Sequence, residues 1–130
     1  MRAYIAEHSL AERVVMLGQK SPNEVRALMA RVRATVLPTL WYEGFPMTIA
    51  ESLSVGTPVI VSDLGNAGAI VREGETGLHF PAGDGDALSL AMASLPDLVA
   101  SSRAYYETHL SPDANLAILN DIYTEILKGH

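Results

Sequence analysis

The chain has 130 residues, with 9 Lys and Arg, 15 Asp and Glu, 4 His and no Cys, which gives a formal net charge of −6. At this length a single domain is the default, and the acidic balance argues against general nucleic-acid binding, which needs a basic surface. Without Cys, neither a disulfide framework nor a zinc–thiolate site is available. The 48% apolar content excludes wholesale disorder, and no apolar run approaches the roughly 20 residues of a membrane helix.

Helices and strands are predicted to alternate along the chain, beginning with the end of a helix over residues 1–10. The apolar run at 14–17, closed by a glycine, predicts a short buried strand. Residues 21–24 read Ser-Pro-Asn-Glu, a capping box that begins a helix with one apolar stripe. A second strand is predicted over 34–37, where the following proline stops it.

The same alternation continues in the second half of the chain. A helix that begins at Pro46 and ends near Val55 precedes a strand over 59–62. A short helix over 67–72 and a strand over 78–80 follow. The remaining helices are predicted over residues 84–95, 96–109 and 112–128. Short apolar strands separated by helices predict an α/β fold, with a parallel sheet covered on both faces.

The segment from Glu43 to Glu51, with the sequence EGFPMTIAE, gives the main functional signal. It joins the end of a strand to the start of a helix, and open α/β sheets bind ligands beyond the carboxyl ends of their strands. A helix start offers unpaired N–H groups and a partial positive charge, which suit a phosphate. Gly44 allows close backbone approach, whereas Pro46 has no N–H to donate. The expected donors are the N–H groups of Phe45, Met47 and Thr48.

Two carboxylates bracket this helix start. Glu43 precedes the helix, and Glu51 lies inside it. The helical period places Glu51 on one face with Ser52, whereas Ile49 and Leu53 share the more apolar face. Because ionised carboxylates accept hydrogen bonds from hydroxyl pairs, the arrangement suits a ligand with hydroxyls on both sides of its phosphates. A nucleotide sugar has this layout. A glutamate near a helix start is also common for a structural reason, since the helix dipole favours it.

An ordered series of motifs surrounds this segment. It comprises WYEGFP at 41–46, ESL at 51–53, GTPVI at 56–60, SDLGN at 62–66, IVREGETGL at 70–78 and PAGD at 81–84. The series resembles the nucleotide-sugar-binding domain of retaining glycosyltransferases of the GT-B fold, especially their family 4 group, over nearly the whole chain. The resemblance implies a Rossmann-like sheet whose first two strands are absent. Residues 1–130 would then form one partial domain, with a C-terminal crossover helix over about 111–130.

The resemblance also implies roles for individual residues. Glu43 takes the catalytic position and contacts donor-sugar hydroxyls, without being assumed to act as a nucleophile, because the donor phosphate is commonly invoked in this family's mechanism. Glu51 holds the ribose hydroxyls, and Gly18 lies where the backbone often touches the base. The sugar and diphosphate are lined by Gly44, Phe45, Met47 and Thr48. Two positions depart from the usual pattern, because Pro46 replaces a frequent Gly and Ala69 replaces a usual Glu.

The implied function is donor binding in a retaining glycosyltransferase that transfers a hexose from a nucleoside-diphosphate sugar to a saccharide or lipid-linked acceptor. No cofactor is implied besides the donor substrate, and no metal. The Asp-Gly-Asp at 84–86 spells a known metal-binding motif, but its place at a helix start favours Asp84 as a cap. The implied partners are the nucleotide sugar and a missing N-terminal domain or partner chain. The implied location is cytoplasmic, compatible with peripheral membrane association through the full enzyme.

The family's first two strands, with an Arg and a Lys that neutralise the leaving diphosphate, are expected upstream of this chain. We therefore expect the isolated chain to be inactive. We also expect the strand at 14–17 to lie far from the others and to leave an exposed apolar face. Two alternatives stay open. One is a non-catalytic nucleotide-binding or interaction module, and the other is half of another GT-B enzyme, such as a sugar-nucleotide epimerase.

Overall fold

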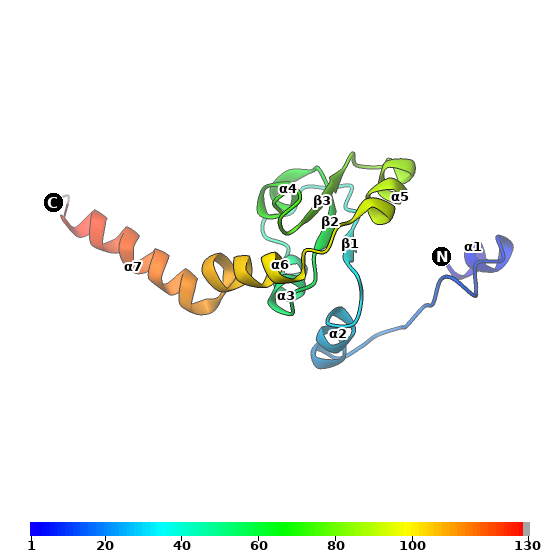
Figure 1. The fold of residues 1–130 in the computed structure, drawn as a ribbon, viewed down its shortest axis with the longest axis horizontal. Helices are drawn as coiled ribbons and strands as arrows, with labels where there is room; N and C mark the ends of the chain where they lie inside the picture. The colour runs from blue at the N-terminus through cyan, green and yellow to red at the C-terminus, as the bar shows by residue number, and fades with distance from the viewer. Residues whose placement is uncertain (129–130) are drawn as a thin grey trace.

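The computed structural model describes residues 1–128, in which three parallel strands are covered by helices (Figure 1). The strands are β1 (Thr35–Leu37), β2 (Val59–Ser62) and β3 (Gly77–Phe80), arranged in the order β1-β2-β3. The helices are α1 (Arg2–Glu7), α2 (Pro22–Met29), α3 (Met47–Ser54), α4 (Gly65–Ile70), α5 (Gly85–Ser94), α6 (Val99–Tyr105) and α7 (Pro112–Lys128), with a π-helical turn η1 (Tyr106–Leu110) between the last two. The predicted α/β class with a parallel sheet is confirmed.

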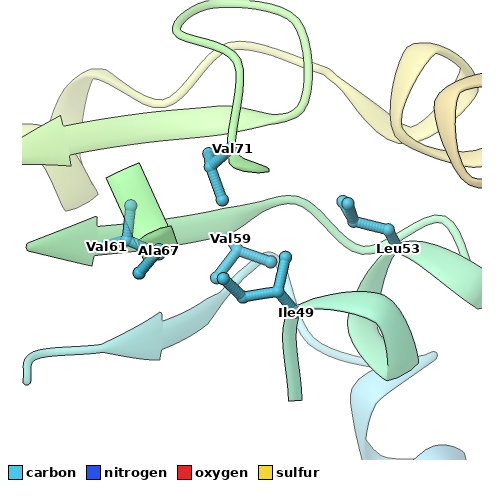
Figure 2. Close-up of a cluster of buried hydrophobic side chains, with 6 residues drawn as sticks. All are labelled: Ile49, Leu53, Val59, Val61, Ala67 and Val71. Carbon is cyan, nitrogen blue, oxygen red and sulfur yellow. The ribbon is translucent and has the colours of Figure 1, made fainter. Parts of the chain in front are cut away.

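The central strand β2 is buried on both faces. Val59 and Val61 point to one side, where they form a cluster with side chains of α3 and α4 (Figure 2). Ile60, between them, points to the opposite side and packs with Phe80 of β3 and with α5. The first cluster contains Ile49, Leu53, Val59, Val61, Ala67 and Val71, and the second contains Ile60, Phe80, Ala91, Leu95 and Leu98. The predicted cover of helices on both faces is therefore confirmed.

The predicted buried strand over residues 14–17 is wrong. This segment belongs to no strand, and its side chains are exposed, with Val15 at 71% and Leu17 at 52%. A strand requires a neighbour to satisfy its backbone groups, and within residues 1–128 the strand nearest in sequence, β1, pairs only with β2. The segment runs as an extended stretch apart from the sheet (Figure 1). The expected exposure of its apolar side chains is observed.

The helix predicted over residues 96–109 begins at Val99 in the structure, and its last part is π-helical. Leu98 is only 6% exposed because it packs into the core below β2. Oδ1 of Asp97 accepts the N–H of Val99 at 3.2 Å, so α6 begins there. After Tyr105 the chain continues as the π-helical turn η1. The last predicted helix is confirmed as α7. Its large apolar side chains are exposed in the structure, among them Leu116, Leu119, Ile122, Tyr123, Ile126 and Leu127.

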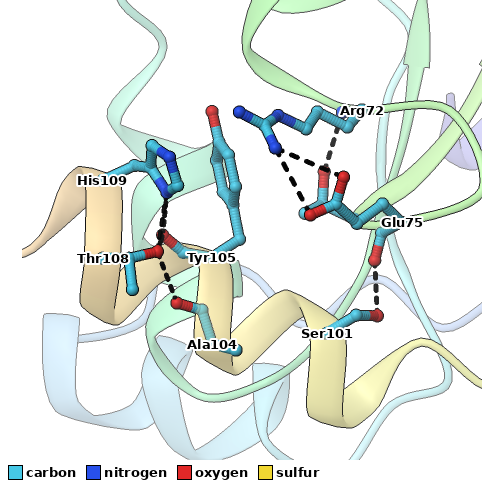
Figure 3. Close-up of polar contacts among 8 residues, drawn as sticks. Arg72, Glu75, Ser101, Ala104, Tyr105, Thr108 and His109 are labelled. Atoms are coloured by element: carbon cyan, nitrogen blue, oxygen red, sulfur yellow. Dashed lines mark hydrogen bonds and ion pairs between the residues drawn. The ribbon is translucent and has the colours of Figure 1, made fainter.

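The turn between α4 and β3 docks onto α6 through polar contacts (Figure 3). The guanidinium of Arg72 lies 3.4 Å from the Glu75 carboxylate and 4.6 Å from the centre of the Tyr105 ring. The hydroxyl of Ser101 donates to the carbonyl oxygen of Glu75 at 2.6 Å. These contacts fix the start of β3 relative to the helix that covers α3.

The capping box predicted at the start of α2 is present. The Ser21 hydroxyl oxygen accepts the N–H of Glu24, and the Glu24 carboxylate accepts the backbone N–H and hydroxyl of Ser21, each at 2.8 Å. The Ser21 backbone N–H, followed by its hydroxyl, holds the pKa of Glu24 below its usual value. A carboxyl whose folded-state pKa is lowered stabilises the fold at neutral pH, and this contribution is lost as the pH falls through that lowered pKa.

Replacing Ser21 with Ala is therefore expected to lower the Tm by roughly 3–5 °C at pH 7. The loss of Tm is expected to be smaller at pH 3 than at pH 7, because protonation of Glu24 as the pH falls through its lowered pKa weakens the bonds to Ser21 in the native chain. Thermal unfolding followed by circular dichroism at both pH values measures this difference. The control is Ser89→Ala, which changes an exposed serine of α5. An equal Tm loss at both pH values would contradict the role of the ionised capping box.

Candidate functional site

The loops that follow the three strands are tied together at the carboxyl edge of the sheet. The hydroxyl of Ser62, at the end of β2, donates to the carbonyl oxygen of Thr39 at 2.8 Å. The two hydroxyls of this pair lie 3.1 Å apart, and both residues are buried. Oδ1 of Asp63 accepts the N–H of Ala82, in the loop after β3, at 3.0 Å. These bonds give the loop over 38–46 a fixed base.

Helix α3 begins at this edge with free backbone donors. Pro46 is its N-cap and provides no side-chain hydrogen bond. The N–H of Ile49 returns to the Pro46 carbonyl oxygen at 3.0 Å, but the N–H groups of Met47 and Thr48 have no acceptor within residues 1–128. Met47 is 62% exposed. These two of the three predicted donors are thus available to a ligand, in the part of the helix where the dipole attracts anions.

The two glutamates lie before and after this helix start. Oε1 of Glu43 accepts the indole N–H of Trp41 at 3.1 Å, which orients the carboxylate before the helix. Glu51 is the fifth residue of α3, and its side chain is exposed. The neighbouring helix positions Ile49 and Leu53 are fully buried, so the expectation that Glu51 avoids the most apolar face agrees with the structure. Phe45, between the glutamates, is 50% exposed.

One helix-face expectation differs from the structure. The helical period places Ser52 beside Glu51, yet Ser52 is fully buried. Its hydroxyl donates to the carbonyl oxygen of Thr57 at 2.8 Å and lies 2.8 Å from the hydroxyl of Thr35. This polar contact holds α3 against β1 and the start of β2. The orientation of Glu51 thus depends on a buried hydrogen-bonded serine one position away.

Two residues of α4 that the sequence left without a role contact the loop over 38–46. Nδ2 of Asn66 donates to the carbonyl oxygen of Gly44 at 2.6 Å. At Gly65 the backbone has φ +60°, and a Cβ there would lie 3.1 Å from Cδ1 of Tyr42. The only sequence signal for these contacts is the SDLGN motif at 62–66, which places both residues just after β2.

The structure does not bring Gly18 to this edge. Gly18 adopts φ +68° in the extended stretch between α1 and α2, which lies apart from the sheet in Figure 1. Apart from its chain neighbours, no atom in the described part of the chain comes within 4 Å of a Cβ added at this position. A contact between Gly18 and the base of a nucleotide stays a prediction.

Within residues 1–128, no group of three or more His, Asp or Glu side chains is placed to hold a metal ion. None of the helices in that range combines the length and hydropathy needed to cross a bilayer. The predicted cap at Asp84 is present, since its Oδ1 accepts the N–H of Ala87 at 2.9 Å.

The parallel sheet and its helical cover make this an α/β protein, and its fold matches solved glycosyltransferase structures of the GT-B type. A family model described as "Glycosyl transferases group 1" matches residues 1–107. The chain therefore belongs to this glycosyltransferase family, and the resemblance of its motifs to those of GT-B glycosyltransferases is confirmed.

Curated relatives come from several bacteria. The chain is 35% identical over 86 residues to a phosphatidyl-myo-inositol mannosyltransferase of Mycobacterium leprae, an alignment that covers 66% of this chain and 23% of the relative. It is 34% identical over 110 residues to the lipopolysaccharide core biosynthesis mannosyltransferase LpsB of Rhizobium meliloti, covering 78% and 30% of the two chains. The chain thus spans less than a third of the length of these relatives.

Solved structures share the fold over nearly the whole chain. A sucrose-phosphate synthase from Thermosynechococcus elongatus superposes with a TM-score of 0.82 at 24% identity, covering 99% of this chain and 34% of that one. Anabaena Alr3699/HepE, solved in complex with UDP, superposes with a TM-score of 0.78 at 20% identity, covering 99% and 36%. A complex of the same Anabaena protein with UDP-glucose gives a TM-score of 0.77.

Proposed function

We propose that this chain forms the donor-binding part of a retaining glycosyltransferase that transfers a hexose from a nucleoside-diphosphate sugar to a saccharide or lipid-linked acceptor. The observation that supports it most is the open start of α3 at the carboxyl edge of the sheet, flanked by Glu43 and Glu51. Two relatives are named as mannosyltransferases, and the Anabaena protein was solved with UDP-glucose, which agrees with this substrate class.

The proposed binding mode assigns each part of the donor to a part of the site. The diphosphate accepts hydrogen bonds from the backbone N–H groups of Phe45, Met47 and Thr48, assisted by the helix dipole. The Glu43 carboxylate, oriented by Trp41, accepts hydrogen bonds from hydroxyls of the sugar. Glu51, further along α3, accepts them from the ribose. Phosphate binding here rests on backbone donors, which is compatible with a chain of net charge −6.

In this proposal the chain binds the donor but does not turn it over. The chain spans 23% and 30% of the two mannosyltransferases, and the acceptor and the cations that neutralise a leaving diphosphate are assigned to the remainder of such a protein. Binding without transfer is also what a non-catalytic nucleotide-binding module would give. Fusing the chain to the rest of a full-length homologue distinguishes a glycosyltransferase part from a non-catalytic module, since only the glycosyltransferase part would then support sugar transfer.

Isothermal titration calorimetry tests the donor-binding proposal directly. The native chain is titrated with UDP-glucose, UDP-galactose and GDP-mannose, and with glucose and uridine as controls that lack the diphosphate. We expect saturable binding of at least one nucleotide sugar and none of the two controls at the same concentrations. Equal binding of uridine and UDP-glucose would contradict a site centred on phosphate, and absence of binding by all three donors would contradict the proposed function.

A further inference from the structure

The start of α4 packs directly against the backbone of the candidate site. The hydrogen bond from Asn66 to the Gly44 carbonyl oxygen joins residues that are 22 positions apart. At Gly65, one residue earlier, an added Cβ would lie 3.5 Å from Cα of Tyr42 and 3.7 Å from the backbone nitrogen of Glu43. The loop after β1 and the helix α4 after β2 therefore meet at Gly44, which lies between Glu43 and the start of α3.

Planar peptide geometry transmits this contact to a predicted ligand donor. The structure contains no cis peptide bond within residues 1–128, so the carbonyl of Gly44 and the N–H of Phe45 point in opposite directions from one rigid plane. Fixing the carbonyl oxygen against Asn66 therefore aims the N–H of Phe45 away from α4. That N–H has no acceptor among the described residues.

Packing alone does not hold this peptide. Apart from its two chain neighbours, no atom of residues 1–128 lies within 4 Å of a Cβ added at Gly44, so no side chain from elsewhere in the described fold restrains the glycine from that direction. The following side chain, Phe45, is 50% exposed. A glycine in open surroundings samples many backbone conformations, and ordering it at the moment of binding costs conformational entropy. The bond from Asn66 is therefore the contact that can order the peptide before a ligand arrives.

We propose that Asn66 is a positioning residue of the donor site, which holds the Gly44–Phe45 peptide plane so that the N–H of Phe45 is preorganised for the diphosphate. The inference rests on the proposed function, and it assigns Asn66 an action through the backbone. The side-chain amide suits this task because it donates a hydrogen bond and adds no charge next to an anionic ligand. Preorganisation of this kind raises affinity because less ordering remains to be done on binding.

The test compares Asn66→Leu, which keeps the approximate size of the side chain but removes its donor, with the native chain. The matched control is Asn115→Leu. Nδ2 of Asn115 also donates to backbone carbonyl oxygens, those of Leu110 and Ser111, each at 3.2 Å, but it lies at the start of α7. Two readouts are taken. They are the backbone ¹⁵N order parameters of Gly44 and Phe45 without ligand, and calorimetric affinity for the nucleotide sugar that the native chain binds best.

We expect the order parameter of the Phe45 N–H to fall from about 0.85 to below about 0.6 in Asn66→Leu and to stay unchanged in Asn115→Leu. We also expect about tenfold weaker donor binding by Asn66→Leu alone. Weaker binding with an unchanged order parameter would make Asn66 a direct ligand contact and overturn the positioning role, as would a lower order parameter with unchanged affinity. A native chain that binds no donor would contradict the proposed function instead, and the order parameters would still decide whether Asn66 holds this peptide.

Discussion

Replacing Gly77 with Ala is expected to destabilise the chain by about 3 kcal/mol, the largest loss of stability that we predict for a single added methyl group. A Cβ at Gly77 would overlap the carbonyl oxygen of Val59 and lie 2.8 Å from Cγ1 of Val71. Both obstacles belong to the buried core, and the first is backbone of the central strand, so neither can move without disturbing the pairing of β2 with β3.

Urea unfolding followed by circular dichroism measures this effect, and a second glycine provides the control. Gly85, the first residue of α5, has no atom within 4 Å of an added Cβ. Gly85→Ala should therefore leave the free energy of unfolding within about 0.5 kcal/mol of the native value. If Gly77→Ala unfolded at the same urea concentration as Gly85→Ala, the register assigned to β2 and β3 would be contradicted.

Replacing Glu51 with Gln is expected to weaken nucleotide-sugar binding by about 2 kcal/mol, or roughly thirtyfold, because hydrogen bonds to a carboxylate are stronger than those to a neutral amide. Stability should hardly change, since the Glu51 side chain is exposed on α3. Calorimetry with UDP-glucose measures the affinity. The control is Glu125→Gln, which removes the same charge from an exposed position of α7.

Binding of UDP, which has the ribose but lacks the sugar, distinguishes the proposed roles of Glu51 and Glu43. If Glu51 holds the ribose, Glu51→Gln should weaken UDP and UDP-glucose to the same extent. If Glu43 holds the sugar, Glu43→Gln should weaken UDP-glucose about tenfold and leave UDP unchanged. If instead Glu43→Gln weakened both ligands and Glu51→Gln weakened only UDP-glucose, the two assignments would be exchanged. If both variants weakened the binding of UDP equally, a sugar contact by Glu43 would be contradicted.

The elements that the sequence predicted well have strong local signals. The capping box at 21–24, the cap at Asp84 and the apolar strand over 59–62 each depend on residues within a few positions of one another. The start of α3 after Pro46 follows from the fixed φ and missing N–H of proline. The position of the candidate site followed from these elements, because a helix that begins after a parallel strand must start at the carboxyl edge.

The features that the sequence did not predict depend on partners far away in the chain. The apolar run over 14–17 matches a buried strand, but strand formation also requires a neighbour, and no strand in the described structure pairs with it. Periodicity placed Ser52 with the exposed Glu51, yet hydrogen bonds to β1 and to Thr57 allow that hydroxyl to be buried. The contact between Asn66 and Gly44 spans two separate loops and leaves no periodic trace in the sequence.

The most direct test of the proposed donor site is a ¹H–¹⁵N NMR titration of the native chain with UDP-glucose. It reports, residue by residue, which backbone N–H groups contact the ligand. We expect the largest shifts, saturating together, at the amides of Phe45, Met47 and Thr48. Saturable shifts confined to other surfaces, such as α5 or α7, or no shifts at millimolar ligand, would contradict a donor site at the start of α3.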